Sequence, residues 1–481
     1  MISLILDQSL QYPEGGEWFS PDERFPEYRF ENIAAKPNPI YRAVRDCYVQ
    51  AGLDAEHLGT PQWNPLGKWI NQGDRVFVLC NFANERRPDE AWMDYRARCT
   101  HGSVIRAVID YILIALNGTG NVTFGNAPTQ FCHWKQVLKD NQADEVEQFY
   151  EQKGIPVHSK DLRLYVTDAT QLGAIRSVER RDESMGIHVD LGRDSLLAEL
   201  EGDAPQRYRV MNYDPDRTMQ FHSTGRHEYV INRQILESDV IFSIPKLKTH
   251  EKVGISCALK GFVGTVGHKD SLPHHRYGSP QMAGDEYPDS TKGVVKFSTA
   301  YHESVQHTVP DSAGGSMLRA SFRVLKRVIR PLAPVIEGAW WGNDTAWRMV
   351  LDLVRIAAYC SAEGKMQSIP VRKQLALIDG IFGGEGEGPA YPTAVHCGVL
   401  QFGDNLPAVD ALNALLMGFD PDKIPLVHRS LLLNKYPLLA RPVEEETIIF
   451  NGRAASMDEF RQESIFHFLP SEGWKERLAS E

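Results

Sequence analysis

The chain has 481 residues, of which 42% are hydrophobic and 24% charged, and its formal net charge at pH 7 is −11. This is the composition of a globular protein with a large core, and the acidic balance argues against a nucleic-acid-binding protein. No apolar run reaches the about 18 residues that a membrane-spanning helix needs, so we expect no transmembrane segment.

The seven cysteines are scattered, and no two of them form a CxxC pair. This spacing predicts neither a zinc ribbon nor an intrinsic iron–sulfur cluster. The first residues include no basic segment before an apolar run, so we expect no signal peptide. Reduced thiols in a cytoplasmic protein are the simplest interpretation.

The first half of the chain predicts a βαβ unit. Residues 1–60 show little periodicity and are interpreted as an N-terminal arm. The apolar run Asp74–Phe82 predicts a buried strand, and the helical spacing from Val104 to Leu113 predicts a helix. Gly120–Pro128 predicts a second strand, and this order of elements is typical of a mostly parallel sheet.

The second half repeats the pattern of a strand followed by a polar segment. Val240–Ile244 predicts a strand that Pro245 ends, and Leu375–Pro389 predicts a strand that continues into an acidic glycine loop. Ala408–Asp420 predicts a helix with a glycine stop. We therefore expect an α/β fold with a mixed, mostly parallel sheet flanked by helices.

Residues 281–370 interrupt the α/β pattern and are interpreted as a helical insertion or lid. Within them, residues 317–330 predict an amphipathic helix with an apolar face beside five basic residues. This helix is either a lid over the protein's own body, which we favour, or a contact with an anionic membrane. The expected divisions are an arm, a first core part, the insertion, a second core part and a C-terminal extension: 1–60, 61–280, 281–370, 371–430 and 431–481.

The segment Ile244–Pro280 concentrates positive and titratable charge in an acidic chain. It holds five lysines, one arginine and four histidines among closely spaced glycines. Lysines around a strand-end loop favour a bound phosphate or carboxylate, and glycines allow backbone N–H groups to approach it. The alternative is a solvated basic loop whose histidines are merely hydrogen-bonded.

Two further motifs carry candidate chemistry. Asp379, Glu385 and Glu387 lie among five glycines, and carboxylates on such a loop suit a hard metal ion or general-base catalysis. The alternative is a solvent-facing turn. In "GNDTAW", Asp344 is expected to cap a helix, so this motif is interpreted as mainly structural.

Four motifs in a fixed order identify a resemblance to a known family. They are "SDVIFSIPKLKTHEKVGISCALKGFVG", "LPHHRYGSP" with "GDEYP", "GNDTAWRMVLDL", and "DGIFGGEGEGP" with "AVDALNALLMGFD". Over roughly residues 74–425, the chain resembles the domain of unknown function 362 family, which is bacterial and archaeal and whose biochemical role is largely undefined. Gly261 stands where the family usually has Asn, and Leu79 where a lysine is frequent. The ferredoxin-like cysteine cluster of many members is missing.

We expect an enzyme that acts on a small phosphate- or carboxylate-bearing metabolite. The expected ligand-binding residues are Asn81, His101, Lys246, Lys248, Lys260, His274, His275 and Arg276. The expected catalytic residues are His250, Asp379 and Glu385, and the same three with Glu387 form the candidate set for a divalent metal, the one cofactor considered.

Two alternatives come from other functional classes. One is a non-catalytic accessory or binding protein of a biosynthetic assembly, peripheral at the membrane through residues 317–330. The other is a metal-dependent redox enzyme that takes electrons from a partner. The sequence indicates neither the substrate nor the oligomeric state.

Overall fold

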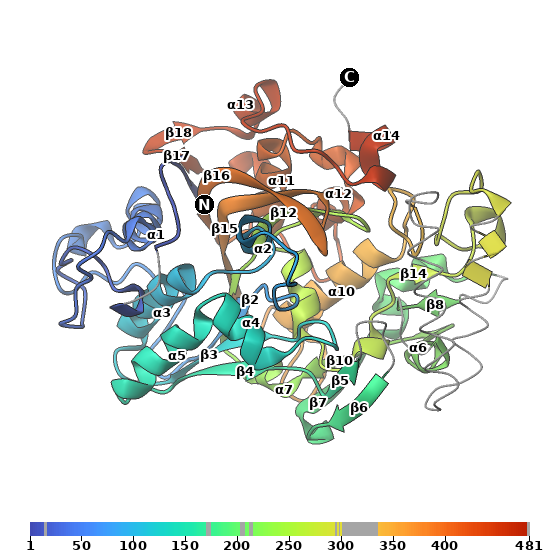
Figure 1. The fold of residues 1–481 in the computed structure, drawn as a ribbon, viewed down its shortest axis with the longest axis horizontal. Helices are drawn as coiled ribbons and strands as arrows, with labels where there is room; N and C mark the ends of the chain where they lie inside the picture. Colours follow the sequence, from blue (N-terminus) through green and yellow to red (C-terminus); the bar gives the residue numbers. More distant parts are fainter. Residues whose placement is uncertain are drawn as a thin grey trace.

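A computed structural model describes residues 1–13, 17–169, 175–202, 207–210, 215–293, 296–297, 299–300 and 335–478. These residues fold around an 11-stranded mixed sheet, drawn in Figure 1. Nine strands follow one path, with this order and these bounds: β18 (Arg453–Ala455), β17 (Ile448–Phe450), β1 (Ile2–Leu6), β16 (Tyr391–Gly403), β15 (Lys373–Glu387), β11 (Val240–Ile244), β2 (Arg75–Cys80), β3 (Asn121–Asn126) and β4 (Val157–Asp161).

One half of the sheet is parallel, as the sequence predicts. β15, β11, β2, β3 and β4 all run in the same direction, and the three strands predicted at residues 74–82, 120–128 and 240–244 are present. Alternate residues of β2 enter opposite cores: Phe77 and Leu79 pack on one face, Val76 and Val78 on the other. The expected α/β class is therefore confirmed.

Helices cover both faces of this sheet. One face packs against α1 (Pro39–Gln50), α3 (Gly102–Leu116), α4 (Trp134–Asp140) and α5 (Ala143–Gln152). The other face packs against α10 (Ala346–Tyr359), α11 (Leu406–Leu416) and α12 (Pro425–Ser430). In the described parts of the chain, no helix is long and apolar enough to cross a membrane.

Both ends of the chain contribute to the sheet. β1 pairs antiparallel with β16 and parallel with β17, so the first residues lie between strands from the second half of the chain. The short helices α13 (Met457–Gln462) and α14 (Lys475–Leu478) follow β17 and β18.

The sequence predicts an acidic glycine loop after the strand at Leu375. This prediction is wrong, because β15 continues through these residues to Glu387. The reason is close packing: a Cβ at Gly383 would lie 2.6 Å from Phe468, and one at Gly384 would lie 3.1 Å from the Cβ of Lys248. These glycines therefore let neighbouring segments approach the strand.

The basic segment is also more regular than expected. After Pro245 the chain resumes as β12 (Lys246–His250), which pairs in parallel with β15 and antiparallel with β13 (Gly254–Ser256). Next come two 3-10 turns, η6 (Lys260–Thr265) and η7 (Lys269–Ser271).

The chain between β4 and α10 also forms a set of smaller elements, which lie at the lower centre and the right of Figure 1. It includes three short sheets, formed by β5 (Tyr165–Ala169) and β6 (Ile175–Arg180), by β7 (Gly186–Asp190), β10 (Arg226–Asn232) and β9 (His222–Ser223), and by β8 (Tyr208–Arg209) and β14 (His275–Arg276). The helices here are α6 (Pro215–Phe221) and α7 (Arg233–Glu237). Elsewhere in the chain, the short helix α2 (Trp92–Arg96) follows β2. The amphipathic helix expected at residues 317–330 lies outside the described residues.

Candidate functional site

Polar side chains meet where the parallel strands end. Asn81 follows β2, and its Oδ1 accepts a hydrogen bond of 2.8 Å from the Nζ of Lys248 on β12. The same ammonium donates to the backbone carbonyl of Arg98 at 2.8 Å. Two of the predicted ligand-binding residues, from chain positions 167 residues apart, are thus in contact at the carboxyl edge of the sheet.

Lys246 belongs to a closed, buried ion pair. Its Nζ lies 3.0 Å from Asp379 Oδ1 and 2.8 Å from the hydroxyl of Tyr12, and all three side chains are buried. The Tyr12 hydroxyl donates to Asp379 Oδ1 at 2.5 Å, and the backbone N–H of His101 donates to the other carboxylate oxygen. Burial lowers the pKa of Lys246, and the charge of Asp379 opposes that shift.

His101 is also held by the fold. It precedes α3, where its ring accepts the backbone N–H of Ser103, and its Nε2 lies 3.0 Å from Gln142 Oε1. Its ring stacks on Tyr12 with centroids 4.2 Å apart. Burial lowers the pKa of His101 to about 3, so this ring is neutral and both of its nitrogens are engaged.

Lys248, Lys260 and Lys269 form a second, very different group, which we call the lysine cluster. Among the described residues, none of the three forms an ion pair with a carboxylate: Lys248 binds two neutral oxygens, Lys269 donates to the carbonyl of Ala127 at 2.7 Å, and Lys260 has no hydrogen bond. Lys248 and Lys269 are buried and Lys260 is half-buried.

Each lysine of the cluster has a lowered pKa. Burial, reinforced by the other positive charges, lowers the pKa of Lys248 to about 7, of Lys260 to about 8 and of Lys269 to about 7. Lys260 repels both of the other ammonium groups, and Lys252 repels Lys260. The charges of Glu251 and Asp161 partly oppose the shifts at Lys260 and Lys269, so the site carries partly compensated positive charge whose protonation changes near neutral pH.

Two histidines beside the lysine cluster have defined tautomers. The Nδ1 of His250 accepts the backbone N–H of Lys252 at 3.0 Å, so its proton is on Nε2. The Nδ1 of His274 donates to the carbonyl of Leu272 at 2.7 Å, so its Nε2 carries a lone pair. Burial first, and then Lys260, lowers the pKa of both rings, to about 3 for His274, and both are neutral.

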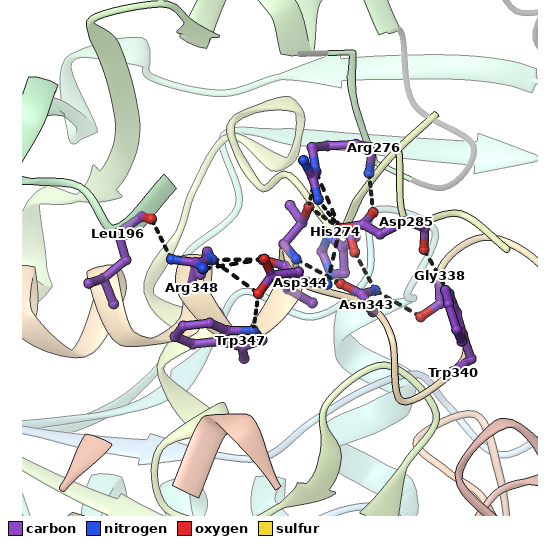
Figure 2. Close-up of polar contacts among 12 residues, drawn as sticks. Leu196, His274, Arg276, Asp285, Gly338, Trp340, Asn343, Asp344, Trp347 and Arg348 are labelled. Atoms are coloured by element: carbon purple, nitrogen blue, oxygen red, sulfur yellow. Dashed lines mark hydrogen bonds and ion pairs between the residues drawn. The ribbon is translucent and has the colours of Figure 1, made fainter. Parts of the chain in front are cut away.

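Figure 2 shows how the "HHR" and "GNDTAW" motifs hold each other. The Asn343 Nδ2 donates to the carbonyls of His274 and Gly338, at 2.9 and 2.8 Å. The Asn343 Oδ1 accepts the backbone N–H groups of Thr345 and Ala346 and so caps α10. The cap predicted at Asp344 is wrong, because that carboxylate binds the Trp347 indole and the Arg348 guanidinium instead.

Two more predicted residues are engaged in this region. The Arg276 guanidinium pairs with Asp285 at 3.3 Å, and that carboxylate also accepts the hydroxyl of Thr345. His275 is buried on β14, and burial lowers its pKa well below the usual range. Its Nδ1 has no hydrogen-bond partner within the described part of the chain.

The candidate metal set is not brought together. Glu385 accepts the backbone N–H of Leu469 at 2.8 Å, Glu387 accepts that of Glu472 at 2.7 Å, and Asp379 is paired with Lys246. Across the described chain, the one group of three carboxylate or histidine donor atoms within 4.8 Å of each other is Asp54, Glu56 and His57. Glu385 and Glu387 therefore hold the C-terminal segment against β15, and Asp379 joins β15 to β12.

Sequence reasoning missed two residues of this region. Lys269 lies in the basic segment that the sequence singled out, so its charge was the available signal. Tyr12 lies in the segment expected to be an arm, and nothing in its local sequence indicates that it reaches Lys246.

Comparison with known proteins gives one family match. The family described as "Domain of unknown function (DUF362)" matches residues 195–414, which include β12 and the lysine cluster. The resemblance expected from the sequence is confirmed. No curated protein matches the chain. A structural-genomics crystal structure of a protein from Thermotoga maritima is similar, with 12% identity and a TM-score of 0.27; the match covers 69% of this chain and 51% of that protein, so this chain spans about half of its length.

Proposed function

We propose that the lysine cluster binds a small phosphate- or carboxylate-bearing metabolite. The observation that carries this proposal is that Lys248, Lys260 and Lys269 form no ion pair with a carboxylate among the described residues, although the charges of Glu251 and Asp161 act on Lys260 and Lys269. Buried charges are unfavourable unless they are paired, and a bound anion would supply the missing partner.

The neighbouring histidines support the same ligand. The Nε2–H group of His250 is a donor suited to an anionic oxygen, because its tautomer is set by the backbone of Lys252. His274 offers a bare Nε2 beside the same lysines. Both rings are neutral, so the charge that attracts the ligand comes from the lysines.

We infer an enzyme rather than a non-catalytic binding protein. Lysines with a pKa of about 7 or 8 exist in both protonation states near neutral pH, which is the condition for efficient general acid–base catalysis. Lys260 is the favoured proton carrier because it is half-buried and has no hydrogen bond among the described residues. Asp379 and Lys246 would hold β12 and β15 together rather than contact the ligand.

Thermal unfolding with added anions tests the binding site. Sulfate, inorganic phosphate and simple carboxylates should raise the Tm of the wild type, and Lys260→Met or Lys269→Met should remove most of that rise. Lys135→Met is the matched control, because Lys135 is an exposed lysine on α4. An equal rise in wild type, Lys260→Met and Lys135→Met would contradict the proposal.

A second experiment separates catalysis from binding. Carboxylates that raise the Tm are incubated with the protein in D2O, and loss of their C–H signals is followed by proton NMR. Exchange in the wild type that Lys260→Met abolishes would support acid–base catalysis. Tight binding without any exchange or turnover would instead favour the accessory binding protein.

A further inference from the structure

A buried pair of histidines lies in the small sheet formed by β7, β10 and β9. His222 and His227 are direct cross-strand partners of β9 and β10, and their ring centroids are 5.8 Å apart. The ring of Tyr208 lies 5.8 Å from His222 and 6.0 Å from His227. All three side chains have no exposed surface. Because directly opposed residues of a hairpin share one face, the two imidazoles form a pair.

The Nε2 atom of each ring is anchored. The Nε2 of His222 lies 3.0 Å from the carbonyl oxygen of Ser271, to which it donates, and the Nε2 of His227 lies 3.1 Å from Glu201 Oε1. A nitrogen that donates to an oxygen carries the proton, so in both neutral rings the lone pair is on Nδ1. Burial lowers the pKa of both rings, that of His222 to about 3.

Three polar atoms of this group have no hydrogen-bond partner among the described residues. The Nδ1 atoms of His222 and His227 and the hydroxyl of Tyr208 are fully buried and make no hydrogen bond in the part of the chain that the structure describes. Two acceptor lone pairs cannot satisfy each other, and an unpaired buried polar atom is unfavourable. A group that attracts lone pairs would satisfy both rings.

We propose that His222 and His227 bind one divalent transition-metal ion of the zinc class through their Nδ1 atoms. Histidine ligands of metals usually donate their other N–H to a carboxylate or a carbonyl, as these two do. Imidazole nitrogens at about 2.0–2.1 Å from a shared ion place ring centroids roughly 5–6 Å apart, which fits the observed separation.

The surroundings supply one carboxylate beside the pair, because Glu201 lies 3.1 Å from His227. The buried Asp352 accepts the hydroxyl of Tyr229, whose ring lies 5.1 Å from His222, but it is already ion-paired with Arg355. The buried hydroxyl of Tyr208, which makes no hydrogen bond to the described residues, would donate to a metal-bound water. Ser271, which anchors His222, belongs to η7 together with Lys269. The ion would therefore stabilise the turn that carries a lysine of the anion site.

Equilibrium dialysis of the metal-stripped full chain with Zn²⁺ tests this site. We expect one equivalent to bind, and His222→Gln with His227→Gln to weaken that binding at least ten-fold. Glutamine keeps a donor at the Nε2 position and deletes the Nδ1 ligand. Asp54→Asn with His57→Gln is the control, because that exposed group is a competing place for a metal, and it should leave the equivalent bound.

The result that overturns the proposal is equally specific. If the wild type binds no more Zn²⁺ than the His222→Gln, His227→Gln variant, a buried water satisfies the three atoms instead. If that variant does not fold, electron paramagnetic resonance of Cu²⁺ added to the wild type decides. Hyperfine coupling to two imidazole nitrogens supports the site, and its absence overturns it.

Discussion

Lys246 and Lys248 lie two residues apart on β12, yet their surroundings are opposite. Lys246 is neutralised by Asp379 and hydrogen-bonded to Tyr12, whereas Lys248 contacts an amide oxygen and a backbone carbonyl. Both are buried, so their exposure does not distinguish them. The difference is the partner: Lys246 is paired within the fold, whereas Lys248 is a lysine that we propose binds an anion.

The comparison also shows why a lysine count is a weak guide to a binding site. Burial lowers the pKa of both lysines, but at Lys246 the carboxylate of Asp379 counteracts the shift, whereas at Lys248 the charges of Arg98, Lys246 and Lys260 add to it. A charge that the protein already neutralises offers little to an anion. A charge that its neighbours repel gains most when an anion binds.

The largest expected loss of stability is at Lys246, the lysine that is paired with Asp379. Lys246→Met should lower the free energy of unfolding by about 3–5 kcal/mol, because it leaves the buried carboxylate of Asp379 uncompensated. Urea denaturation measures this. Lys260→Met should change the free energy of unfolding by less than about 1 kcal/mol, since it removes no hydrogen bond among the described residues. Equal losses of unfolding free energy in the two variants would contradict the distinction between the Lys246–Asp379 pair and the lysine cluster.

A smaller loss is expected at the tyrosine of the pair. Tyr12→Phe should destabilise the protein by about 1.5–3 kcal/mol, because it removes hydrogen bonds to a charged carboxylate and from a charged ammonium. Chemical denaturation measures the loss, and the sulfate-induced rise in Tm should persist. A variant that loses the sulfate response while remaining folded would place Tyr12 in the anion site.

The stability of the ligand-free protein should depend on pH through the lysine cluster. The pKa values of about 7 for Lys248 and about 8 for Lys260 lie below the ordinary value of 10.5. The unfolded chain therefore binds more protons than the folded chain from about pH 7 to about pH 10.5, so these two groups make the ligand-free protein more stable as pH rises through that range.

Anion affinity should change in the opposite direction. Sulfate keeps its charge over this range, and it binds the ammonium form of the lysines. Its Kd should therefore rise at least ten-fold, a free-energy change of about 1.4 kcal/mol, between pH 7 and pH 9. Isothermal titration at constant ionic strength measures it. A Kd that stays constant across this range would show that these lysines do not contact the anion.

The smallest effect is expected at the acidic end of β15. Glu385→Gln retains an oxygen that accepts the N–H of Leu469, so the free energy of unfolding should fall by less than about 1 kcal/mol. Sulfate binding should not change. The same assay on Asp379→Asn is the contrasting variant, because that carboxylate is buried and paired. A loss of turnover in Glu385→Gln without a loss of stability would show that Glu385 is a catalytic residue.

The sequence alone determined the class of fold and the region of the candidate site. Apolar runs and helical spacing identified the strands at 74–82, 120–128 and 240–244 and the helix at Val104–Leu113, because burial imposes those periods directly on the residues. The density of lysine and histidine between Ile244 and Pro280 identified the basic segment. Both are local signals, since each depends on residues close together in the chain.

The tertiary structure decided which charges are already neutralised. Asp379 and Tyr12 lie 133 and 234 residues from Lys246, and the partners of a buried charge at such separations follow from strand order and register rather than from neighbouring residues. The same holds for the glycines of β15. The sequence predicts a loop there, but the structure has a strand in which β12 and Phe468 pack closely against these glycines. Composition predicts where polar groups gather, and only the packed fold determines which of them remain without a partner.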